Sequence, residues 1–235
     1  MLEMYRTLTE QAPSELTACC AAPGPSGAMA RQGSPRQAHR CVVHLSQRKL
    51  TEGEKLVAPI NSFGSPVGDI IQRRTYVSQQ SLLDATQPKG RRYYWKSEYL
   101  PGLEPELLAT LRRHAERILS PHSAIILFPI GGALNRVPDD HSAVGNRDTA
   151  WVLNITSSWE KAEDDAANIE WARAAWREVR RFSTGGTYVN FLTEEEGDER
   201  IRAAYGNNYQ RLAEIKAKWD PGNLFCMNKN IPPKR

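Results

Sequence analysis

The chain of 235 residues is long enough for one large domain or two small ones with a sizeable hydrophobic core. Hydrophobic residues make up 40% of it and charged residues 25%, as in an ordinary globular protein. The net charge is only +4, and basic residues stand beside acidic ones instead of forming a stripe, which argues against a nucleic-acid partner. No apolar run approaches the roughly 18 residues of a membrane span, so we expect no membrane partner.

The cysteines and histidines indicate neither a disulfide framework nor a metal site. Cys19 and Cys20 are adjacent, Cys41 and Cys226 stand apart from them, and the spacing Cys-x-x-Cys does not occur. The five histidines show no metal-ligand spacing, and we expect His114, within a charged helix, to lie on the solvated surface. The first residues, MLEMYRTLTEQAP, lack the apolar core of a secretory signal. We therefore predict a cytoplasmic protein with free thiols and no metal.

The N-terminal segment is expected to be incomplete. Residues 2–11 favour a short helix, but residues 21–40, AAPGPSGAMARQGSPRQAHR, contain no Val, Ile, Leu, Phe, Tyr or Trp. Such a stretch cannot bury enough apolar surface to offset the entropy lost on ordering. We interpret residues 21–40 as disordered or frame-shifted, and residues 1–48 as a partial, poorly ordered segment.

From residue 41 onward, apolar periodicity predicts regular elements. The clearest is the helix over 104–119, in which apolar residues recur at helical spacing. Strands are predicted over 41–45, 66–76, 91–100, 123–130, 149–159 and 187–192, and further helices over 51–63, 78–85 and 164–182. Because strands and helices alternate without a strict rhythm, we expect an α+β fold in which helices pack on one face of an antiparallel β-sheet.

The sequence contains no Gly-x-Gly-x-x-Gly turn, no phosphate-loop signature and no Gly-x-Ser-x-Gly elbow. By residue chemistry alone, Tyr188 is a packing residue of a strand, Asn223 serves the turn at 220–225, and Asn228 and Asn230 belong to a solvated tail. The hypothesis of an independent α+β domain that binds a small ligand therefore stays open. It predicts that Tyr188→Phe and Asn190→Ala change only stability.

The C-terminal pattern strongly resembles that of the berberine-bridge-enzyme-like FAD-linked oxidoreductases. It consists of Tyr-x-Asn at 188–190, Asn-x-x-Arg-Leu at 208–212, Asp-Pro-x-Asn-x-Phe at 220–225 and Asn-Ile-Pro-Pro at 230–233. The resemblance extends upstream through GGALNRVP and WVLNI to about residue 49, and more weakly it covers residues 4–18. The resemblance implies a substrate-binding domain over 49–186 and a C-terminal berberine-bridge-like segment over 187–235. In that family an FAD-binding domain precedes these parts, so we expect the chain to represent about half of the usual enzyme.

The same resemblance assigns roles to particular side chains. It places the Tyr188 phenol near the flavin N5, where it would remove or steer a proton while hydride passes to the flavin. Asn190, on the same side of the predicted strand, would hydrogen-bond the polar edge of the ring. Asn228 and Asn230 would offer amides to FAD. The residues implied at the substrate face are Tyr76, Gln80, Tyr94 and Lys96.

The function implied is that of an FAD-dependent oxidase or dehydrogenase that oxidises a C–H group bearing OH or N in a small molecule. We expect the chain to be inactive alone, since most of the binding energy for FAD would come from the absent domain. The alternative is a non-catalytic remnant, or a subunit that docks on a separately encoded FAD-binding domain. Residues 21–40 stand where the family has a hydrophobic strand pair, which is the reason to suspect a shift of reading frame there.

Overall fold

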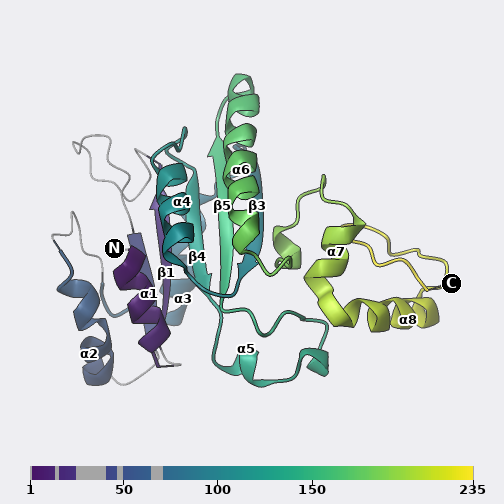
Figure 1. The fold of residues 1–235 in the computed structure, drawn as a ribbon, viewed down its shortest axis with the longest axis horizontal. Helices are drawn as coiled ribbons and strands as arrows, with labels where there is room; N and C mark the ends of the chain where they lie inside the picture. Colours follow the sequence, from purple (N-terminus) through teal and green to yellow (C-terminus); the bar gives the residue numbers. More distant parts are fainter. Residues whose placement is uncertain (1, 14–15, 25–40, 47–49, 65–70, 235) are drawn as a thin grey trace.

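The structure is a computed structural model that describes residues 2–13, 16–24, 41–46, 50–64 and 71–234. Its centre is a five-stranded antiparallel sheet with the strand order β2-β1-β4-β5-β3 (Figure 1). The strands are β1 (Leu16–Pro23), β2 (Cys41–Ser46), β3 (Arg92–Leu100), β4 (Ala124–Pro129) and β5 (Trp151–Trp159). The long strands β3 and β5 are rich in aromatic and β-branched residues, which favour a pleated, half-buried surface.

Three helices cover one face of this sheet: α1 (Leu2–Gln11), α4 (Pro105–Ala115) and α6 (Asp165–Val179). Figure 1 shows α4 and α6 side by side in front of β4, β5 and β3. The main core lies between the two layers, where Leu107 and Leu111 of α4 and Ala172 of α6 meet Leu153 and Ile155 of β5. The expected α+β fold with helices packed on one face of an antiparallel sheet is thereby confirmed.

The N-terminal residues contribute more order than the sequence led us to expect. Within residues 1–48, the described residues form α1, β1 and β2, and β1 pairs with β4 in the centre of the sheet. Tyr5 of α1 is fully buried and donates a hydrogen bond to the carbonyls of Ala18 (2.7 Å) and Leu127 (3.1 Å). Of the stretch interpreted as disordered or frame-shifted, residues 25–40 lie outside the described residues.

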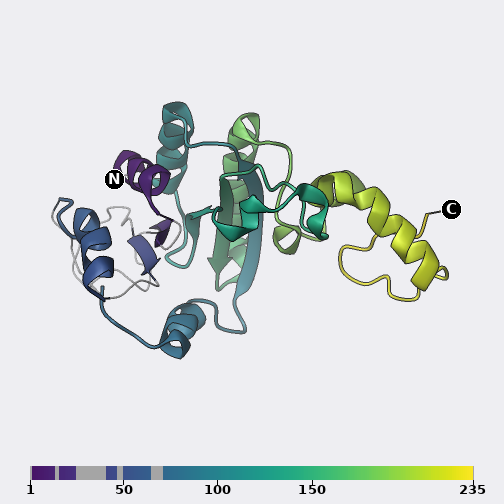
Figure 2. The ribbon, with the colours of Figure 1, turned by 90° about the horizontal axis from the view of Figure 1, so that it is seen from below.

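The remaining helices lie around the sheet and beyond it. They are α2 (Leu50–Asn61), α3 (Tyr76–Gln80), α5 (Ala133–Arg136), α7 (Asp198–Tyr205) and α8 (Tyr209–Trp219). Helices α7 and α8 with the tail that follows, residues 198–234, form a C-terminal arm that extends away from the sheet in both views (Figures 1 and 2). Asn208 Nδ2 anchors the arm by a hydrogen bond of 2.7 Å to the carbonyl of Asp139. Among the described residues, no helix is long and apolar enough to cross a membrane.

Most predicted elements are confirmed, but three predictions are wrong. No strand forms over the described part of 66–76; residues 71–75 are irregular and α3 begins at Tyr76. The strand expected over 187–192 is instead a 3₁₀ turn at Val189–Phe191, and none of the described strands pairs with it. His114 is buried between α4 and α6, where its Nε2 lies 3.2 Å from Glu178 Oε1. Although its neighbours in the sequence are charged, His114 lies on the side of α4 that faces the core.

A candidate active site on the second face of the sheet

The sheet has a second face, turned away from α1, α4 and α6. Tyr94 and Glu98 of β3 contact side chains of α6, so alternation along the strand turns the odd-numbered residues from Tyr93 to Tyr99 the other way. Antiparallel pairing carries the same alternation into β5. The residues assigned to the second face are Tyr93, Trp95, Ser97 and Tyr99 of β3 and Val152, Asn154, Thr156 and Ser158 of β5.

Neutral polar groups gather in the middle of this second face. Ser97 and Asn154 are direct partners in the register, with 1% and 8% of their surface exposed. Neither Ser97 Oγ nor Asn154 Oδ1 has a hydrogen-bond partner among the described residues, and the same holds for Trp95 Nε1. A buried polar atom left without a partner costs about 1–3 kcal/mol, so such atoms usually meet water or a ligand. The second face therefore holds, in its middle, buried polar groups without a partner among the described residues.

Tyr188 and Asn190 form a pair at one end of the second face. The 3₁₀ turn at Val189–Phe191 brings them together, and Asn190 Nδ2 donates a hydrogen bond of 2.6 Å to the Tyr188 phenol oxygen. The Tyr188 ring meets Phe191 edge-on at 5.3 Å between centroids, and Phe191 lies 6.3 Å from Phe128 at the end of β4. Burial, together with the charge of nearby Tyr188, raises the pKa of Tyr99 to about 12. The ring contacts place the Tyr188–Asn190 pair beside Phe128, and the backbone N–H of Tyr99 donates a hydrogen bond of 2.9 Å to the carbonyl of Gly186, two residues before Tyr188.

The structure turns Tyr94 and Lys96 toward α6, on the other face of the sheet. The Tyr94 hydroxyl donates to Glu195 and accepts a hydrogen bond of 3.1 Å from Arg173 Nε. Burial, followed by this bond to Glu195, raises the pKa of Tyr94 above its ordinary value. Lys96 is 3% exposed, and its Nζ lies 2.6 Å from Glu195 Oε1. Substrate contact by these two residues stays a prediction, and it needs an approach from the α6 side.

Tyr76 and Gln80 lie at the two ends of α3. Both are exposed, Tyr76 to 73% of its surface. In both ribbon views α3 lies away from the C-terminal arm (Figures 1 and 2). Among the described residues, no hydrogen bond, ion pair or ring contact joins Tyr76 or Gln80 to the Tyr188–Asn190 pair, and their contact with a substrate also stays a prediction.

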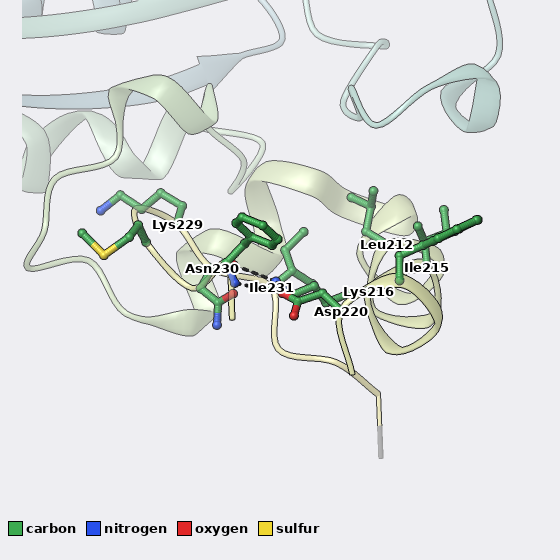
Figure 3. A pocket seen from close by; sticks show the side chains of 10 residues that line it. Leu212, Ile215, Lys216, Asp220, Lys229, Asn230 and Ile231 are labelled. Carbon is green, nitrogen blue, oxygen red and sulfur yellow. Dashed lines mark hydrogen bonds and ion pairs between the residues drawn. The ribbon is translucent and has the colours of Figure 1, made fainter. Parts of the chain in front are cut away.

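The C-terminal arm carries an apolar groove of about 490 Å³ (Figure 3). It is lined by Leu212, Ile215, Lys216, Trp219, Asp220, Phe225, Met227, Lys229, Asn230 and Ile231. The turn between α8 and the tail is closed by Asp220, which accepts hydrogen bonds from the backbone N–H groups of Leu224 (2.7 Å) and Phe225 (3.0 Å). Asn223 has φ of 53° in this turn, as its turn role predicts.

Asn228 and Asn230 stand on either side of a residue that links the tail to the Tyr188 region. Lys229 Nζ donates a hydrogen bond to the carbonyl of Thr193, three residues after Asn190. Asn230 lines the groove and Asn228 is exposed. Both amides thus lie on a stretch that is tied to the segment carrying Tyr188. Among the described residues, no group of three or more His, Cys, Asp or Glu side chains could hold a metal ion.

Sequence comparisons relate the chain to flavin-dependent enzymes. Residues 187–232 match the family described as Berberine and berberine like. YvdP, an uncharacterized FAD-linked oxidoreductase of Bacillus subtilis, is 28% identical over 193 residues, which are 79% of this chain and 42% of YvdP. The aclacinomycin-N/aclacinomycin-A oxidase of Streptomyces galilaeus is 30% identical over 142 residues, 53% of this chain and 26% of the oxidase. The chain thus spans less than half the length of these relatives.

Solved structures share the fold over nearly the whole chain. Berberine bridge enzyme from Eschscholzia californica superposes with a TM-score of 0.82 over 99% of this chain and 52% of the enzyme, at 14% identity. Likeness at this identity concerns the fold alone. With the family match over residues 187–232, it confirms the resemblance drawn from the C-terminal pattern.

Proposed function

We propose that this chain, a member of the berberine-bridge-enzyme-like FAD-linked oxidoreductases, supplies the substrate-binding and C-terminal parts of an FAD-dependent oxidase or dehydrogenase. Residues 49–186 would form the substrate-binding domain and residues 187–235 the berberine-bridge-like segment. The observation that carries the proposal is the Tyr188–Asn190 pair, which lies within the matched segment and at the end of a neutral polar sheet face.

The residues present fit the ring end of FAD. Tyr188 and Asn190 are exposed and offer a phenol and an amide, and Phe191 and Phe128 extend an aromatic surface beside them. Asn228 and Asn230 would add amides from the tail. The sequence lacks the glycine-rich turn whose N–H groups bind a pyrophosphate. We therefore propose that this chain alone binds FAD weakly and is inactive without an FAD-binding domain.

Bound FAD would supply a two-electron acceptor for a C–H group that bears OH or N. The part of this chain is to orient the small-molecule substrate and to move its proton. Ser97 Oγ and Asn154 Oδ1, buried and without partners, would hydrogen-bond the substrate on the second face. As the phenolate, Tyr188 would take the proton of the substrate OH or NH and become neutral, and the N–H of Asn190 would stabilise the phenolate before this transfer.

Flavin retention and flavin bleaching test the proposal in two steps. The chain is incubated with excess FAD, desalted and examined by absorption; it is then co-expressed with the FAD-binding half of YvdP. We expect a colourless chain alone, and a co-purified complex that keeps FAD and is bleached anaerobically by one member of a panel of alcohols, sugars and amines. Tyr188→Phe should keep the flavin and slow bleaching about 100-fold, the usual contribution of a positioned proton acceptor.

Three results contradict the proposal. Near-stoichiometric FAD on the chain alone would show that no further domain is needed. Bleaching at an unchanged rate in Tyr188→Phe would remove the role of the phenol. Absence of flavin in every combination would contradict a flavin-dependent function. The cytoplasmic location expected from the sequence stays a prediction, which cell fractionation would test.

The second candidate function is a non-catalytic subunit that docks on a separately encoded FAD-binding domain. The observation that favours it is the apolar surface of the C-terminal arm. Trp219, Leu224, Phe225 and Met227 are 76%, 78%, 77% and 82% exposed. Exposed apolar patches of this kind mark surfaces that bind a partner. This candidate shares the expected complex with the first, but it predicts that Tyr188→Phe leaves flavin bleaching unchanged.

A further inference from the structure

We propose that a buried charged cluster between β3, α6 and α7 clamps both ends of residues 185–193 and thereby positions Tyr188 and Asn190. The cluster consists of Lys96 and Glu98 of β3, Glu196, and Arg200 of α7. The side chains of Lys96, Glu98 and Glu196 are more than nine-tenths buried, and that of Arg200 is 11% exposed. The role assigned to the segment rests on the proposed function, but the clamp itself is a property of the fold.

Arg200 holds the beginning of the segment. Its Nη1 donates a hydrogen bond of 3.1 Å to the carbonyl of Gly185, three residues before Tyr188. Its Nη2 donates one of 2.9 Å to the carbonyl of Ser97 and lies 3.0 Å from Glu98 Oε1. One guanidinium therefore joins the backbone of β3 to the backbone of the segment, in directions that its planar fork fixes.

Glu98 ties the same end to α6. Its carboxylate is fully buried and accepts a hydrogen bond of 2.6 Å from Trp176 Nε1 of α6. The Ser183 hydroxyl, just before the segment, donates to the other carboxylate oxygen. A buried charge is costly unless it is paired and hydrogen-bonded, and Glu98 has all its partners only when β3, α6, α7 and the segment are in place together.

At the other end of the segment, Thr193 is held by hydrogen bonds. Its backbone N–H and its hydroxyl donate to Glu196 Oε2 at 2.9 and 3.2 Å, and its Oγ1 accepts a hydrogen bond of 3.2 Å from Lys96 Nζ. The other oxygen of the same carboxylate, Glu196 Oε1, lies 3.2 Å from Arg200 Nε. Glu196 thus connects the two ends of the segment through one side chain.

The segment between the two ends has little regular structure of its own. It is tied to β3 by backbone bonds from Thr184 N to Tyr99 O (3.0 Å) and from Tyr99 N to Gly186 O (2.9 Å), and then enters the single 3₁₀ turn that carries Tyr188. Irregular segments with few buried contacts open locally at low free-energy cost. The charged cluster opposes this opening from outside the segment, which makes Arg200 a positioning residue.

Hydrogen exchange of the full chain tests the clamp without requiring flavin or activity. In Arg200→Met we expect the amides of Thr184, Phe191 and Leu192 to exchange about tenfold faster relative to those of β5, because several charge-assisted bonds are lost. Arg200→Lys, which keeps the charge but loses the fork, should show part of this increase. The side-chain amide signal of Asn190 in NMR spectra should move toward that of a free amide in Arg200→Met.

Arg92→Gln is the matched control. Arg92 lies on the same strand and pairs with Asp165 of the same helix, but it makes none of the contacts with residues 185–193 described above. Replacement of Arg92 should leave unchanged the ratio of amide exchange rates between Thr184, Phe191 and Leu192 on one side and β5 on the other. Equal acceleration in the segment and β5, or the same ratio in Arg92→Gln as in Arg200→Met, would overturn the proposal. Should Arg200→Met fail to fold, an unchanged ratio in Arg200→Lys overturns it as well.

The two proposals fail separately. If hydrogen exchange follows the expectation and Tyr188→Phe nevertheless leaves flavin bleaching unchanged, the clamp stands and the catalytic function is wrong. If bleaching depends on Tyr188 while the exchange ratio stays constant in both Arg200 variants, the function stands and the clamp is wrong.

Discussion

Asn190 donates its side-chain amide to the phenol oxygen of Tyr188 at 2.6 Å, across one 3₁₀ turn of the chain. The amide donor is directed at the atom on which negative charge would appear when Tyr188 loses its proton. Both side chains are exposed, so the hydrogen bond serves little packing purpose. This relationship is what a proton-transferring pair requires.

The first prediction concerns that bond. In the complex with an FAD-binding half, Asn190→Ala should lower the rate of flavin bleaching about 100-fold, as loss of one oriented donor does elsewhere. Its melting temperature should not change, because exposed substitutions cost less than about 0.5 kcal/mol. Asn207→Ala, also exposed, is the control and should alter neither quantity. A rate in Asn190→Ala equal to that of the control would contradict the role of the amide.

The second prediction concerns the entry to the same turn at Gly186. A Cβ there would lie 2.5 Å from Asn146 Oδ1 and 3.1 Å from Tyr99 Cδ2. Gly186→Ala should therefore lower the free energy of unfolding by about 1–3 kcal/mol, the usual cost of overpacking. Gly131→Ala has open space around the added carbon and is the matched control. Urea denaturation of both variants measures the difference, and equal stabilities would show that the turn relaxes freely.

The orientation of β3 could not be predicted from its sequence. The run RYYWKSEYL predicts a strand, because aromatic residues fill it, but both of its faces carry aromatic side chains. Tyr94 and Lys96 were therefore as plausible for a ligand face as Tyr93 and Trp95. The orientation of the strand depends on residues distant in the sequence. Tyr94 and Lys96 face α6, where they contact Arg173 and Glu195.

Two other features show where local patterns succeed and where they do not. The buried position of His114 could have been predicted from the sequence, because His114 follows Leu107 and Leu111 by seven and three residues on the inner side of α4. The 3₁₀ turn at Val189–Phe191 could not have been predicted, because TYVNFL has strong strand propensity. What distinguishes it from a strand is that none of the described strands pairs with it. Tyr188 and Asn190 are in contact through this 3₁₀ turn, and not through the strand alternation on which the expectation rested.

The third prediction is a pH dependence of stability that originates at His114. Burial lowers the pKa of His114 below its ordinary value, although Glu178 opposes this and Arg113 and Arg117 add to it. The unfolded chain therefore takes up a proton at a higher pH than the folded chain does. Stability should fall as the pH drops from about 7 toward 5, a window above the titration of most carboxylates.

Thermal melts of the chain and of His114→Gln between pH 7.5 and 5 measure this effect. The melting temperature of the variant should change less over this range than that of the unchanged chain. Parallel curves would show that His114 makes no contribution.

The last prediction concerns the apolar surface of the C-terminal arm. Trp219 and Phe225 line the groove beside α8, and each exposes more than three quarters of its surface. If an FAD-binding domain covers this surface, Phe225→Ser should weaken binding of that domain at least about tenfold, because large aromatic residues dominate interface energies. Leu83→Ser, in the 3₁₀ helix at Ser81–Thr86, removes an exposed apolar side chain elsewhere and is the control. Titration by surface plasmon resonance measures both, and equal affinities would place the docking surface outside the arm.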